Sequence, residues 1–197
     1  MGVCGIYAAK VDCKKMEVLK KVTTEYLLEE QVERVLSLLT PVNRVVMRVA
    51  LHTGLRISDV LGLKKSDIDK GLQFWITESK TGKRKRVALT QELWDDVRSL
   101  CGKYWVFENR TDRAKHRSRQ AVWRDVKRAE HALRLPQNIG PHSARKVYAV
   151  RLMEEYGSIP KVQKALNHDR DSTTMIYAMA DTLLRAKYRK RGKRRKT

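Results

Sequence analysis

Cysteine is scarce in this chain of 197 residues, and its three copies form no CxxC pair: Cys4, Cys13 and Cys101. An odd number of widely spaced cysteines is not the pattern of a disulfide scaffold or a zinc knuckle. The histidines show no ligand spacing that would complete a metal site with these cysteines, so we predict no metal ligands. Reduced thiols are typical of a reducing compartment, and we expect the protein to work there.

Long hydrophobic runs are missing as well. No stretch of about 18 apolar residues occurs, which argues against a membrane-spanning helix. No basic and then apolar leader opens the chain, so we expect no export and a cytoplasmic location. The hydrophobic content of 42% is nevertheless too high for a wholly disordered chain, and it predicts a folded core.

Acidic residues are few compared with basic ones. The chain has 22 Asp and Glu against 43 Lys and Arg, which gives a formal net charge of +21. Such a surplus favours a polyanionic partner, because binding releases the counterions condensed on it. Nucleic acid is the leading candidate. A basic ribosomal or architectural protein would have the same balance, so the charge indicates the partner and leaves the chemistry open.

The hydrophobic pattern predicts a mostly helical α+β protein with one small antiparallel sheet. Strand-like alternation covers residues 73–77 and 84–89, with a turn at Lys80-Thr81-Gly82-Lys83 between them, and residues 104–107 are predicted as a further short strand. Helical periodicity or helix boundaries predict helices over residues 26–39, 42–50, 57–61, 91–100, 118–134, 142–156, 160–167 and 172–179.

Three parts of the chain differ in composition. Residues 1–23 mix lysine with small residues and are predicted as a basic N-terminal arm, and residues 24–184 are predicted as one domain. Residues 185–197 form a tail with nine Lys or Arg and no acid. This tail is interpreted as a solvated, disordered terminus or as a sequence-independent tether to phosphates, and both can hold together.

Four short segments contain arginine, lysine, histidine or tyrosine residues that are considered together. They are residues 53–63 around Arg56, residues 78–83 around Lys80, Pro141-His142-Ser143-Ala144-Arg145, and Leu166-Asn167-His168 with a nine-residue step to Tyr177. Singly, each residue has an ordinary structural explanation, such as a capping arginine or a partly buried tyrosine. Together, in this order and spacing, the segments resemble the conserved boxes of the tyrosine recombinases, the phage integrase family. The resemblance covers about residues 24–182.

The resemblance implies the tyrosine-recombinase catalytic fold and a site-specific recombinase or integrase. Such an enzyme cuts and rejoins DNA through a 3′-phosphotyrosyl intermediate, without metal, ATP or another cofactor. By this pattern Tyr177 attacks the scissile phosphate, although its ordinary pKa of about 10 means that it needs help to lose its proton. Arg56 and Arg145 would bind the non-bridging oxygens, because a guanidinium group matches phosphate and stays charged.

The remaining site residues follow from the same resemblance. Lys80 would protonate the 5′ leaving oxygen, His142 would assist proton transfer and His168 would donate a hydrogen bond to the phosphate. Asp59, three residues after Arg56, is expected to orient the site.

Two residues depart from the family pattern. Asn167 replaces the glycine common before the third-box histidine, and Lys146 stands where many relatives have histidine. Neither change removes a catalytic group. The chain also has only about 23 residues before the first predicted helix, where most members carry a DNA-clamping domain. A naturally short recombinase and a catalytic fragment of a longer integrase are both compatible with this length, and Tyr177 could act in its own protomer or a neighbour's.

The basic surface predicts the partners. Double-stranded DNA is expected to contact seven residues, which as an alternative form a solvated charged face: Lys83, Arg84, Lys85, Arg117, Arg119, Arg124 and Lys127. The resemblance adds other copies of the chain, in a dimer or tetramer on DNA, and accessory DNA-bending proteins. Three further histidines are predicted to be structural: His52, His116 and His131.

Two other functions fit the same motifs. A type IB topoisomerase-like enzyme would use the same residues to relax supercoils when one duplex is bound. A DNA-binding regulator would keep the fold and carry out no strand exchange. The target sequence and the choice among integration, excision and inversion are open at this point.

Overall fold

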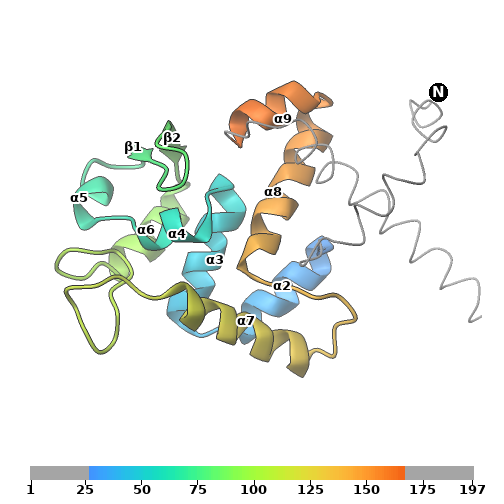
Figure 1. The fold of residues 1–197 in the computed structure, drawn as a ribbon, viewed down its shortest axis with the longest axis horizontal. Helices are drawn as coiled ribbons and strands as arrows, with labels where there is room; N and C mark the ends of the chain where they lie inside the picture. The colour runs from blue at the N-terminus through green and yellow to red at the C-terminus, as the bar shows by residue number, and fades with distance from the viewer. Residues whose placement is uncertain (1–26, 167–197) are drawn as a thin grey trace, which may run out of the picture.

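The computed structural model describes residues 27–166, and the fold is that of this part of the chain. Figure 1 shows α3 near the centre, with the β-hairpin and α5 on one side, α8 and α9 on the other, and α7 along the lower edge. The elements in chain order are α2 (Glu29–Leu38), α3 (Pro41–Thr53), α4 (Ile57–Leu61), α5 (Lys65–Ile68), β1 (Gln73–Thr77), β2 (Arg84–Ala88), α6 (Gln91–Ser99), α7 (Arg119–Ala132), α8 (Pro141–Tyr156) and α9 (Ile159–Ala165).

Local chemistry explains where the helices begin and end. Pro41 occupies the first turn of α3, where the missing N–H has no partner within the helix to lose. Thr90 and Ser118 cap α6 and α7, because their side-chain oxygens accept from Leu93 N at 3.3 Å and Ala121 N at 3.1 Å. Gly54 ends α3 in the left-handed conformation, with φ of 64°.

The core is built around α3 and α8. Helix α3 packs against α2, α4, α6 and α8, while α7 covers α2, α4 and α8. Val46 and Val49 of α3, Val126 of α7 and Val147 of α8 are all buried in one hydrophobic cluster. Burial of these side chains holds the C-terminal end of α3 close to α8, and both regions carry predicted site residues.

Strands β1 and β2 form an antiparallel hairpin that packs one face on the core. Phe74 pairs with Val87, and both side chains are buried. Trp75, paired with Arg86, lies on the opposite face, and both are exposed. This alternation follows from the two-residue period of a strand. The hairpin continues beyond the strands, since Glu78 N donates to Lys83 O at 2.9 Å.

The predicted fold class and the described helices are confirmed, with shifts of a few residues at some ends. The predicted strand over residues 104–107 is wrong. Within residues 27–166, Trp105 forms an isolated bridge with Lys64 and belongs to no strand, and the short helix α5 was not predicted. The predicted helix at residues 172–179, the arm and the tail lie outside the described residues. Within residues 27–166, no helix is long and apolar enough to cross a membrane.

Candidate active site

Arg56 lies where the turn after α3 meets α4. It is the N-cap residue of α4, and its Nη1 donates to Glu78 Oε2 at 2.7 Å. The same nitrogen is 4.0 Å from Asp59 Oδ2. The side chain keeps 18% of its surface exposed, whereas that of Glu78 is fully buried. The guanidinium group is therefore fixed by carboxylates on one side and remains accessible to a ligand on the other.

Arg145 projects from the first half of α8 into the protein and is 1% exposed. Its Nη1 donates to the main-chain oxygen of Gly54 at 2.6 Å, and its Nη2 donates to the main-chain oxygen of Leu166. Gly54 precedes Arg56 by two residues. The structure thus brings the first and second arginine boxes together, although they are far apart in the sequence.

Lys80 lies at the tip of the hairpin, next to two residues that hold the hairpin on α4. Ser79 donates to Asp59 Oδ1 from its main-chain N at 2.8 Å and from its Oγ at 2.6 Å. Asp59 therefore joins the hairpin to the region of Arg56, and its role in orienting the site stays a prediction. Lys80 lines an open groove of about 850 Å³ together with Arg56 and His142.

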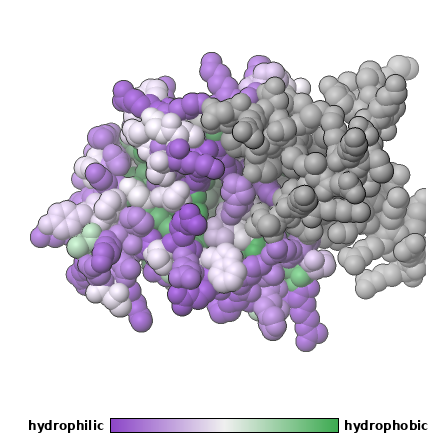
Figure 2. Space-filling view, viewed as in Figure 1, coloured by the Kyte–Doolittle hydropathy of each residue, from purple (hydrophilic) through white to green (hydrophobic). Residues whose placement is uncertain are grey.

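The groove has a second wall on α7. Arg119, Gln120 and Trp123 line it, and Trp123 is 48% exposed. The indole was not singled out from the sequence, where its helical spacing fits a core residue equally well. The coloured residues in Figure 2 are mainly hydrophilic, with small hydrophobic areas between them. Such a surface suits a polar, extended ligand better than a small apolar one.

His142 lies in the first turn of α8, at the rim of the groove. Surrounding protein atoms partly desolvate the imidazole, which lowers the pKa of His142. The positive charges of Lys146, Arg145 and other cations lower this pKa further, to about 4. The residue is nevertheless exposed to solvent, and it lines the groove. At neutral pH the imidazole is therefore neutral and able to accept a proton.

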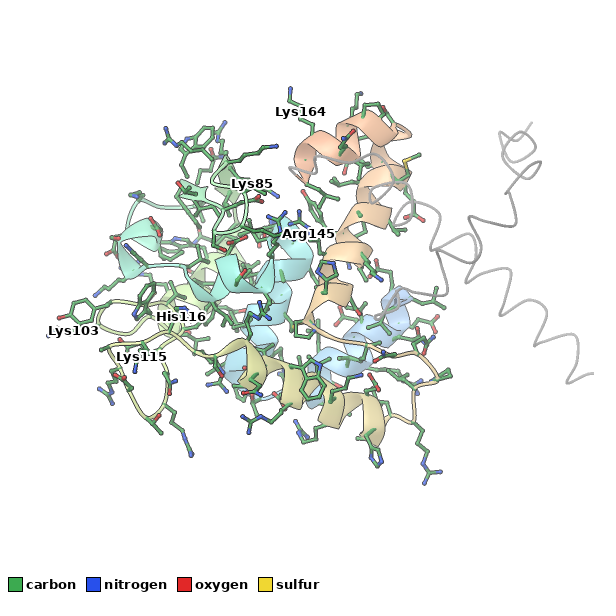
Figure 3. All side chains as sticks on the ribbon, in the orientation of Figure 1. Lys85, Lys103, Lys115, His116, Arg145 and Lys164 are labelled. Carbon is green, nitrogen blue, oxygen red and sulfur yellow. The ribbon has the colours of Figure 1, made fainter. Side chains whose placement is uncertain are left out.

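Lys85 points inward from β2, beneath the site. Its Nζ donates to the main-chain oxygen of Thr53 at 2.9 Å and lies 5.6 Å from the ring centre of Tyr148. Burial, followed by the charge of Arg145, lowers the pKa of Lys85 to about 8. Figure 3 shows Lys85 and Arg145 close together at the centre of the molecule. The predicted surface role of Lys85 therefore does not match its position, because it shares the inward face of β2 with Val87.

The other predicted DNA-contact residues fall into two groups. Arg117 and Lys127 are engaged internally: Arg117 Nε donates to Asn43 Oδ1 at 2.7 Å, and Lys127 Nζ donates to Glu130 Oε2 at 2.7 Å. Four are exposed, and their contact with DNA stays a prediction: Lys83, Arg84, Arg119 and Arg124.

Two of the six predicted catalytic residues, His168 and Tyr177, lie outside the described residues. The other four are Arg56, Lys80, His142 and Arg145. Three of them line the groove, and Arg145 is fixed behind Arg56 through Gly54. Sequence reasoning missed Glu78 as a partner of Arg56. Its only sequence signal was its place two residues before Lys80.

This arrangement has a match among known families. A family model described as the phage integrase family matches residues 25–183. The chain belongs to the phage integrase family. It is 30% identical over 161 residues to "Tyrosine recombinase XerA" of Thermococcus kodakarensis, covering 77% of this chain and 56% of the relative. It is also 31% identical over 135 residues to "Probable integrase/recombinase YoeC" of Bacillus subtilis, covering 66% of this chain and 74% of the relative.

Solved structures of the phage integrase family share the fold. The catalytic domain of bacteriophage HP1 integrase matches with a TM-score of 0.59 and 25% identity, over 79% of this chain and 87% of that one. A lambda integrase dimer bound to a COC′ core site matches with a TM-score of 0.68 and 22% identity, over 80% and 49%. The chain spans about half the length of several curated relatives, at 48 to 56%.

Proposed function

We propose that this chain is a site-specific DNA recombinase that forms a 3′-phosphotyrosyl intermediate. The observation that carries the proposal is the convergence of two arginine boxes, the hairpin lysine and His142 around one groove. The names of the curated relatives, which are tyrosine recombinases and integrases, support the same reaction.

In this proposal Arg56 and Arg145 bind the non-bridging oxygens of the scissile phosphate. Both are held before DNA arrives, Arg56 by Glu78 and Arg145 by main-chain oxygens. Fixed cations stabilise the extra negative charge of the pentavalent transition state without having to reorganise. Loss of one such preorganised donor typically costs about 2.7–4 kcal/mol of transition-state stabilisation.

Proton transfer would use Lys80, His142 and Tyr177. As Tyr177 Oη forms a bond to phosphorus, the bond from phosphorus to O5′ breaks, and Lys80 Nζ gives its proton to O5′. His142, neutral at pH 7, assists by accepting the proton that Tyr177 Oη loses, and His168 donates a hydrogen bond to the phosphate. The phosphotyrosyl ester conserves the free energy of the broken phosphodiester bond. A second 5′-hydroxyl can therefore attack this ester and rejoin the strand without ATP.

The proposed partners are duplex DNA and further copies of the chain. Lys83, Arg84, Arg119 and Arg124 are exposed cations that would bind backbone phosphates, and Arg119 also lines the groove. Assembly of protomers into a dimer or tetramer on two DNA sites follows the lambda integrase neighbour, described as a dimer on DNA. We further propose that it acts on cytoplasmic DNA, with accessory DNA-bending proteins as additional partners.

A covalent trap tests the reaction. The protein is incubated with nicked duplexes made from repeats in the DNA that flanks its gene, and a denaturant-resistant adduct is expected that Tyr177→Phe abolishes. Arg145→Ala should suppress cleavage far more than binding, whereas Arg98→Ala, an exposed arginine of α6, should change neither. Tight binding without any adduct would favour a regulator, and plasmid relaxation without recombinants would favour a topoisomerase-like enzyme.

The tail supplies a separate test of DNA affinity. Residues 185–197 carry nine Lys or Arg, so their removal should flatten the dependence of log affinity on log salt concentration if they bind phosphates. An unchanged slope would exclude that role of the tail.

A further inference from the structure

Glu78 is a fully buried carboxylate at the base of the hairpin tip. Its Oε2 accepts from Arg56 Nη1 at 2.7 Å and from Thr81 Oγ1 at 2.8 Å. Burial by itself raises the pKa of Glu78, but the hydrogen bonds from Thr81 and Arg56 and the charge of Arg145 outweigh burial and lower it. Glu78 is therefore an anion at neutral pH, paired with a cation of the site.

A second contact holds the hairpin beside the first. Ser79 donates to Asp59 Oδ1 through both its main-chain N and its Oγ. Two consecutive hairpin residues thus bind two residues of the α4 region that are three positions apart, Arg56 and Asp59. The next hairpin residue is Lys80, which lines the groove with Arg56. The position of Lys80 therefore depends on contacts made immediately before it in the chain.

The two carboxylates also balance the charge beneath the groove. Asp59 and Glu78 act electrostatically on Lys85, which the charges of Arg56 and Arg145 also affect. Within residues 27–166, one oxygen of each carboxylate has no hydrogen-bond partner, namely Asp59 Oδ2 and Glu78 Oε1. These anions offset the mutual repulsion of the cations and allow them to stay close together without DNA.

We propose that Glu78 is a positioning residue that docks the hairpin on Arg56 and thereby places Lys80 at the leaving oxygen. This inference rests on the proposed function. Glu78 touches no reacting atom. It acts at the step in which the bond from phosphorus to O5′ breaks, the bond from phosphorus to Tyr177 Oη forms, and Lys80 Nζ protonates O5′. Without Glu78 the hairpin loses its ion pair to Arg56. Lys80 Nζ is then no longer held at the leaving oxygen, and protonation of O5′ is slower.

The test uses leaving groups that differ in their need for a proton. One nicked duplex carries the ordinary scissile phosphodiester, and a second carries sulfur in place of the bridging O5′. Sulfur leaves as a thiolate, so cleavage of the second duplex needs no proton from Lys80. Glu78→Gln should slow the ordinary substrate by about 100-fold, the cost of displacing a reacting group by about 1 Å, and should cleave the sulfur substrate at nearly the wild-type rate.

Further variants show whether a defect of Glu78→Gln comes from leaving-group protonation, phosphate binding or loss of charge. Lys80→Ala should behave like Glu78→Gln, while Arg145→Ala should be slow on both substrates. Glu92→Gln removes an exposed carboxylate of α6 that pairs with Arg48, and it controls for the loss of one negative charge. Glu78→Asp keeps the charge but shortens the reach to Arg56, and it should show the same selective loss if Glu78→Gln folds poorly.

The possible results separate this inference from the proposed function. Equal slowing of both substrates by the Glu78 variants would overturn it, because the defect would then lie in phosphate binding by Arg56. Unchanged rates in both variants would also overturn it. Absence of a Tyr177 adduct with the wild-type chain on either substrate would instead refute the proposed recombinase reaction.

Discussion

Arg145 Nη1 donates a hydrogen bond of 2.6 Å to the main-chain oxygen of Gly54. This bond joins α8 to the turn that ends α3 and begins the segment carrying Arg56. A main-chain acceptor is positioned by backbone geometry, so the turn itself sets the relative placement of the two arginines. The conformation of Gly54 therefore influences the site as well as the stability of the fold.

Gly54→Ala should destabilise the protein strongly. Gly54 has φ of +64°, and an added Cβ would lie 2.1 Å from Cδ1 of the Tyr148 ring. The left-handed backbone alone costs an L-residue about 1–2 kcal/mol, and the clash adds to this cost. Urea denaturation should therefore show a larger loss than for Gly82→Ala, because Gly82 has φ of +66° and open space around its Cβ. Equal losses would show that the Tyr148 ring moves freely.

Asp125 should stabilise the fold at neutral pH, and this contribution should be lost in acid. Its Oδ2 accepts from Thr40 N and Asn43 Nδ2, and Oδ1 accepts from Arg128. Burial raises the pKa of Asp125, but these donors outweigh it and lower the pKa to about 2. The folded pKa is below the unfolded one, so its stabilisation of about 2 kcal/mol is present above pH 4 and is lost between about pH 4 and 2.

The variant Asp125→Asn measures that contribution. Free energies of unfolding from urea titrations should differ between wild type and variant near pH 6 and converge as the pH falls toward 2. Asp95→Asn, which changes an exposed carboxylate of α6, serves as the control and should leave the pH dependence unaltered. A constant difference at every pH would contradict the lowered pKa of Asp125.

His142 should stay neutral in the DNA-free protein far below the usual range of histidine. Its pKa is lowered to about 4, against an ordinary value near 6.5. Its ring-proton chemical shift, assigned with His142→Gln, should therefore titrate near pH 4. Bound phosphate favours the imidazolium form and should raise this midpoint. A midpoint near 6.5 without DNA would contradict the influence of the surrounding cations.

Lys85→Met should raise the melting temperature at pH 7. The folded pKa of Lys85 is about 8, below its ordinary value, so the charged form is disfavoured in the fold. The loss of folding free energy caused by this charge is fully present below pH 8. It is relieved as the pH rises from about 8 to 10.5. The difference in melting temperature should therefore shrink at alkaline pH. Lys85→Arg, which keeps the charge, should gain nothing, and a lower melting temperature for Lys85→Met would contradict this prediction.

Sequence reasoning succeeded where a signal was local. The helix predicted over residues 142–156 is α8, which begins at Pro141. Sequence reasoning failed where the outcome depended on a distant partner. Trp105 could not become part of a strand without a neighbouring extended segment. Lys85 lies two residues before Val87 on β2, and the two-residue period of a strand could have assigned it to the buried face.

The sequence by itself determined the family boxes, the excess of positive charge, and the helix ends set by residues such as Pro41 and Gly54. These properties depend on residue identity and on chain neighbours a few positions away. Only the tertiary structure decided that Glu78 pairs with Arg56, that Arg145 is buried against Gly54, and that the pKa of His142 falls. Burial and Coulomb interactions depend on distances between groups that folding alone brings together.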